Sequence, residues 1–124
     1  MTPRQVRNAW GTDFGVCRNC PRRTWYFTYR RFQPQGAAVG FERGRVDAVW
    51  TLWSPPRWTT RRGALRIGAR EARVTAVLGA LVTVPCGSYS ALVRTRGDVT
   101  TAYYLFGGRL WGFGLMRSSA SPCR

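Results

Sequence analysis

The chain has 124 residues with 20 basic and 5 acidic side chains, so its formal net charge is +15 at pH 7. All the basic residues are arginines and histidine is absent, which excludes Ser–His and Cys–His catalytic pairs. We therefore expect no enzyme activity, no cofactor and no metal site. The hydrophobic fraction of 44% excludes a disordered chain, and no apolar run is long enough to span a membrane.

Two helices are predicted. At the start of the chain, Thr2 can cap a helix, Pro3 suits its first position and Gln5 completes a capping box. Gly11 ends this helix in the way that glycine commonly does. A second helix is predicted over residues 70–78, and it is also followed by a glycine.

The other predicted elements are strands rich in aromatic and β-branched residues. They cover residues 24–30, 38–41, 46–53, 88–94, 100–106 and 109–117. Arg43–Gly44, Arg96–Asp98 and Gly107–Gly108 are predicted turns between them. Pro55–Pro56 interrupts regular structure and indicates a linker.

An internal repeat organises these elements. The residues that align, 68 positions apart near the helices and 64 apart near the last strands, are Val6 with Val74, Trp10 with Leu78, Gly11 with Gly79, Gly44 with Gly108, Arg45 with Arg109 and Val46 with Leu110. We predict an α+β fold of two tandem helix-plus-antiparallel-sheet repeats. Residues 1–54 would form repeat one, with a helix and a three-stranded sheet; residues 55–64 the linker; and residues 65–124 repeat two, on the same plan.

A capped helix, a strand with Trp-Tyr and a hairpin with Phe-x-x-Gly-Arg-Val form a pattern carried by Met1, Thr2, Val6, Gly11, Trp25, Phe41, Gly44 and Val46. The second repeat matches at Gly68, Val74, Gly79, Gly108 and Leu110, with Ala69 and Arg70 in place of Met and Thr. The pattern resembles the small envelope domains of the BamE/SmpA/OmlA type and the tandem-repeat beta-lactamase inhibitor proteins of actinomycetes. This resemblance implies a non-enzymatic, exported protein that presents a sheet to a partner. It transfers no inhibitory contact residue to this chain.

Four cysteines indicate an oxidising compartment. Cys17 and Cys20 form a C-x-x-C motif in a predicted loop, which favours a small disulfide over a redox or metal site. Cys86 and Cys123 would then form the other disulfide; pairings between the repeats are the alternative. We expect an extracellular or cell-envelope location. Because no signal peptide precedes the first helix, we also expect the native chain to start upstream of Met1.

Aromatic residues on the strands exceed what one thin core needs, and a Trp/Tyr/Arg surface is typical of binding hot spots. The predicted partner-binding residues are Trp25, Tyr29, Trp50, Trp53 and Trp111, with Arg61 and Arg62. The expected partner is a protein or an anionic envelope component. One alternative is a nucleic-acid or polyanion binder, which the charge favours. Another is a structural subunit whose aromatic face is buried between copies. An all-arginine set is also typical of GC-rich, actinobacterial-like coding.

Overall fold

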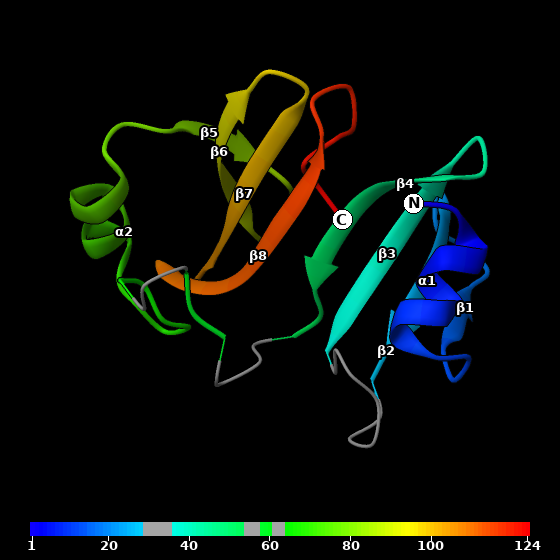
Figure 1. Cartoon of the computed structure of the whole chain (residues 1–124). Coiled ribbons are helices and arrows are strands. Elements are labelled where there is room, and N and C mark those ends of the chain that lie inside the picture. Colours follow the sequence, from blue (N-terminus) through cyan, green and yellow to red (C-terminus); the bar gives the residue numbers. More distant parts are fainter. Residues whose placement is uncertain (29–35, 54–57, 61–63) are drawn as a thin grey trace.

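The computed structural model describes residues 1–28, 36–53, 58–60 and 64–124. In chain order, the elements in these ranges are α1 (Pro3–Trp10), β1 (Gly15–Cys17), β2 (Arg23–Phe27), β3 (Ala37–Glu42), β4 (Arg45–Thr51), α2 (Glu71–Leu78), β5 (Val82–Pro85), β6 (Ser90–Arg96), β7 (Val99–Phe106) and β8 (Arg109–Arg117). Figure 1 shows the strands as one curved sheet, with α1 and α2 at its two opposite ends.

The eight strands form a single antiparallel sheet in the order β1-β2-β3-β4-β8-β7-β6-β5. Its middle is the pairing of β4 with β8, in which Ala48 lies opposite Met116 and Trp50 lies opposite Gly114. Each helix has only eight residues. The predicted fold class, α+β with two tandem helix-plus-sheet repeats, is therefore wrong. Over the described ranges, the architecture is one eight-stranded sheet with two short helices.

This error has a physical reason. Apolar alternation predicts that a segment is a strand, but it does not say which distant strand will pair with it. The pairing of β4 with β8 is of this kind. The prediction of three strands per repeat also missed β1 and β5, the two edge strands of the sheet. Both are short, and β5 ends at Pro85, a residue type that suits sheet edges because it donates no ladder hydrogen bond.

The predicted start of the first helix is confirmed. The Thr2 hydroxyl accepts a hydrogen bond from the Gln5 backbone N–H, and the Gln5 side-chain oxygen accepts one from the Thr2 backbone N–H at 2.8 Å. Helix α2 lacks such a cap, because Arg70 stands at that position. The first backbone N–H of α2 instead donates to the carbonyl oxygen of Gly108 at 3.0 Å. Local capping therefore fixes α1, whereas contact with the sheet fixes α2.

Each helix covers an apolar core on the same face of the sheet. Val6 of α1 packs on a cluster that contains Trp25, Phe27, Val39 and Phe41. Val74 of α2 packs on a cluster that contains Leu65, Leu92, Leu105 and Leu110. Val49 of β4 lies opposite Leu115 of β8, which carries this face across the middle of the sheet. We call it the helix face.

The other side of the sheet, which we call the open face, is defined by one row of cross-strand neighbours. From β1 to β5 the row is Gly15, Tyr26, Ala38, Trp50, Gly114, Ala102, Val93 and Val82. No helix packs on this face in the described parts of the chain. A tail of residues 118–124 crosses it instead, and Figure 1 shows this tail (red) folding back from β8 toward β4.

Two disulfides are present, Cys17–Cys20 and Cys86–Cys123, which confirms the predicted pairing. The first closes the connection between β1 and β2. The second ties the tail to the segment after β5, and closing a loop of this length contributes about 4 kcal/mol through the denatured state.

Neither helix has the length and apolar character that crossing a membrane requires, as far as the described residues go.

Candidate binding face

The open face is a floor of small residues on which large rings lie. Gly15 faces Tyr26 across the β1–β2 pair, and a Cβ atom on Gly15 would stand 2.0 Å from the Tyr26 ring. A Cβ atom on Gly40 would stand 3.1 Å from the Trp50 ring. Glycine permits this close approach because it has no side chain. The rings of Tyr26 and Trp50 therefore lie along the sheet instead of standing away from it.

Two β-bulges each bring one further side chain to this face. The register of β3 with β4 shifts at Gly40 and leaves Asp47 without a cross-strand partner. The register of β7 with β8 shifts at Tyr104 and leaves Trp111 without one. A bulge changes the direction of the extra side chain. Asp47 and Trp111 align with each other in the sequence repeat, yet one is acidic and the other aromatic.

An open groove of about 650 Å³ lies on the open face, and we call it the aromatic groove. Its lining residues are Cys17, Cys20, Thr24, Tyr26, Thr28, Ala38, Trp50, Leu52, Trp53, Trp111 and Arg124. Most of this lining is apolar, and the volume lies in the range of ligand-binding sites. Trp53 is 71% exposed, the largest value among the large apolar side chains of the described residues. Its φ of 54° is a strained backbone conformation for a bulky residue.

Arg124 forms one end of the groove. Its guanidinium lies 4.1 Å from the centre of the Trp111 ring and 4.8 Å from that of Tyr104. It also donates a hydrogen bond to the backbone carbonyl of Thr51. Burial lowers the pKa of Arg124 because desolvation penalises the charged form, while Tyr104 and Tyr89 act in the opposite direction. The guanidinium therefore lies against aromatic rings, although Arg124 as a whole residue is exposed.

Two tyrosines fix the tail that carries Arg124. The Tyr104 hydroxyl donates to the carbonyl oxygen of Pro122 at 2.7 Å. The Tyr89 hydroxyl accepts from the backbone N–H of Arg124, also at 2.7 Å. Tyr104 is fully buried, and this burial raises the pKa of its hydroxyl well above the ordinary value. Together with the disulfide of Cys123, these bonds hold one wall of the groove in place.

A second, polar pocket of about 410 Å³ adjoins the tail. Its lining residues are Pro21, Arg22, Arg23, Phe41, Glu42, Arg43, Asp47, Ser119, Ala120 and Ser121. Arg22 and Asp47 form an ion pair of 2.9 Å, and Asp47 is 6% exposed. The other carboxylate oxygen of Asp47 is buried without a hydrogen-bond partner. The Arg22 side chain, Asp47 and the Trp50 ring all converge above Gly40, so this pocket and the aromatic groove meet there.

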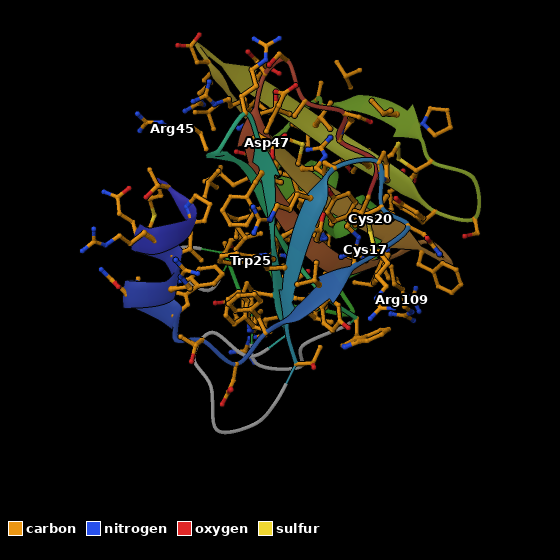
Figure 2. All side chains as sticks on the ribbon, turned by 90° about the vertical axis from the view of Figure 1, so that its right-hand side faces the viewer. Cys17, Cys20, Trp25, Arg45, Asp47 and Arg109 are labelled. Carbon is orange, nitrogen blue, oxygen red and sulfur yellow. A yellow bond between two sulfur atoms is a disulfide. The ribbon has the colours of Figure 1, made fainter. Side chains whose placement is uncertain are left out.

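The predicted site residues divide into three groups. Trp50, Trp53 and Trp111 come together in the aromatic groove. Trp25 does not join them: it is 1% exposed and stacks on Phe14 in the helix-face core, with ring centres 3.9 Å apart. Figure 2 shows Trp25 on the side of β2 that faces α1, with Cys17 and Cys20 on the other side. Tyr29, Arg61 and Arg62 lie outside the described residues.

The correction for Trp25 follows from strand alternation. Neighbouring residues of β2 point to opposite faces, so Trp25 and Tyr26 cannot share one. Sequence analysis also missed Arg124 as part of the groove and Tyr104 as the residue that holds the tail, because the path of the tail is set by distant contacts. The pairing of Cys86 with Cys123 was the one signal that places the tail beside the sheet.

The described residues contain no cluster of three or more His, Cys, Asp or Glu side chains that could hold a metal ion. Comparisons with protein-family models, with curated proteins and with solved structures found no match to this chain. The resemblance to the BamE-type and beta-lactamase-inhibitor-type proteins therefore stays a prediction. A function can be inferred only from the residues and geometry of the open face.

Proposed function

We propose that this chain is an exported, non-enzymatic binding protein that recognises a protein partner through the aromatic groove on its open face. The observation that carries the proposal is the grouping of Trp50, Trp53 and Trp111 in one groove. Tryptophan is enriched in binding hot spots because a large ring desolvates well at little cost in entropy. The two disulfides support export, since such bonds persist in oxidising compartments.

The conformation of Trp53 supports the same function. A strained backbone and a 71% exposed ring do not stabilise the folded chain. A bound partner would cover this ring and gain the free energy of burying it, which is about 25 cal/mol for each Å² of apolar surface. The arginines then steer an acidic partner toward the face by long-range attraction.

The test compares three immobilised proteins against the secreted and cell-surface fraction of the native host. They are the wild type, a Trp50→Ala/Trp53→Ala double variant and a Leu115→Ala control, whose side chain is 53% exposed on the helix face. Quantitative mass spectrometry should find a partner that the wild type and the control retain and the double variant loses. Equal losses of binding and of melting temperature in the double variant would contradict the proposal.

A second candidate function is the binding of nucleic acid or another polyanion. The net charge of +15 favours it, as does the count of ion pairs: Arg22–Asp47 is the one pair within the described ranges. Its test is the fluorescence anisotropy of a labelled single-stranded oligonucleotide over a range of salt. Binding that neutralises six or more phosphates of a single strand should weaken by at least about 300-fold between about 50 and 200 mM salt. A shallow dependence would exclude this function.

A further inference from the structure

Arg124 brings a positive charge into the aromatic groove without an acidic neighbour. Its guanidinium uses Trp111 and Tyr104 as ring contacts and the Thr51 carbonyl as a hydrogen-bond acceptor. No aspartate or glutamate side chain of the described residues forms an ion pair with it. A guanidinium offers five N–H donors, so donors remain for a bound group. An incoming anion would form charge-assisted hydrogen bonds with a guanidinium that its ring contacts already orient.

The remaining lining of the groove is mostly apolar, so it favours a ligand that carries an apolar group beside the anion. Arg124 is the one arginine among the lining residues, and the indole rings of Trp50, Trp53 and Trp111 dominate the remainder. A nucleic-acid strand fits this arrangement poorly, since its phosphates recur along the backbone and need several cations in line. A carboxylate placed next to an aromatic or aliphatic side chain fits it well. The net charge of +15 adds a long-range preference for an acidic partner.

We propose that the aromatic groove binds an acidic segment of a protein partner, in which a carboxylate adjoins an apolar side chain. The carboxylate pairs with Arg124, and the apolar side chain lies against Trp50 and Trp53. This inference rests on the proposed function, because it names the chemistry of the partner. It adds Arg124 as the residue that decides specificity, since planar guanidinium groups bind carboxylates through two parallel hydrogen bonds.

The experiment uses two probes of equal size, N-acetyl-L-phenylalanine and N-acetyl-L-phenylalaninamide, which differ in the negative charge. Each is titrated into the ¹⁵N-labelled full chain, and the indole N–H signals of Trp50, Trp53 and Trp111 are followed by NMR. We expect the acid to bind at least about tenfold more tightly than the amide. Arg124→Gln should abolish this preference. Arg117→Gln, which removes the same charge at the end of β8, should retain it.

Three results would overturn the inference: neither probe shifts the groove indoles, both probes bind equally, or the preference persists in Arg124→Gln. Arg124→Lys guards against a folding defect, because it keeps the charge and should retain part of the preference. Failure of the proposed function gives a different pattern. There the acid probe would still bind preferentially, while the Trp50→Ala/Trp53→Ala variant would capture the same host proteins as the wild type.

Discussion

The hydroxyl of Tyr104 donates a 2.7 Å hydrogen bond to the backbone carbonyl of Pro122, which joins the middle of β7 to the tail. Only the neutral hydroxyl can donate this bond. Burial raises the pKa of Tyr104 above its ordinary value of 10.0, so the folded chain keeps a proton that the unfolded chain loses. The contribution of Tyr104 to stability is therefore complete below about pH 10 and falls as the pH rises further.

We predict that Tyr104→Phe lowers the free energy of unfolding by about 1 kcal/mol at neutral pH, since one hydrogen bond is lost and the Pro122 carbonyl is left unpaired. The variant should also lose less stability than the wild type between about pH 9 and pH 11. Urea denaturation at both pH values checks this. If the wild type and Tyr104→Phe lose the same free energy of unfolding between about pH 9 and pH 11, the pH dependence does not come from Tyr104.

The Cys86–Cys123 disulfide should contribute more stability than Cys17–Cys20. Its sequence separation is 37 residues against 3, and the entropy removed from the unfolded chain grows with the loop that is closed. Replacing both Cys86 and Cys123 by serine should cost about 4 kcal/mol, and the same change at Cys17 and Cys20 about 2 kcal/mol. Urea denaturation of the two double variants measures the difference.

The Cys86/Cys123 double variant should also release the tail that carries Arg124 from its position beside the sheet. We therefore expect it to lose partner binding at temperatures where it remains folded. The Cys17/Cys20 variant serves as its control. If both double variants bind the partner like the wild type, the tail is not part of the binding site.

Trp25 and Trp53 should respond to substitution in opposite ways. Trp25→Ala removes a ring that is 1% exposed and should cost about 3–5 kcal/mol. Trp53→Ala removes a ring that is 71% exposed and should change stability by less than about 0.5 kcal/mol. Partner binding should show the reverse order once both proteins are compared below their melting temperatures. A large loss of stability in Trp53→Ala would mean that this ring packs in the fold.

The sequence predicted those features of the fold that depend on neighbouring residues. The Thr2–Gln5 capping box sets a helix start within one turn, and Arg43–Gly44 forms the turn between β3 and β4. The single sheet could not be predicted in this way, because it depends on the contact of β4 with β8. That contact involves segments far apart in the chain, and neither strand carries a local signal for its partner.

The candidate site could also be predicted only in part, because some of its residues are placed by contacts between distant segments. Trp50, Trp53 and Trp111 were grouped from composition, and they do share one groove. Alternation along β2 assigns Trp25 and Tyr26 to opposite faces, but it does not say which face a helix covers. Arg124 carried no sequence signal of its own, since its position follows from the hydrogen bonds of the tail to Tyr89 and Tyr104.

Gly40 should be difficult to replace, because three side chains converge above it. A Cβ atom there would stand 2.8 Å from the Arg22 side chain, 3.0 Å from Asp47 and 3.1 Å from the Trp50 ring. Gly40→Ala must therefore displace both the ion pair and the ring, and we expect a loss of about 1–3 kcal/mol. Partner binding should weaken as well, because Trp50 would no longer lie flat in the groove.

Gly15→Ala provides the matched comparison. Its Cβ atom would stand 2.0 Å from the Tyr26 ring, which is the closer contact of the two. Tyr26 is 37% exposed beside the edge strand, however, so its ring can swing into solvent at a small cost. We expect Gly15→Ala to cost less than Gly40→Ala in urea denaturation and to leave the indole signal of Trp50 unchanged in NMR spectra. A larger loss of stability in Gly15→Ala than in Gly40→Ala would mean that the ring of Tyr26, and not that of Trp50, is held rigidly against the sheet.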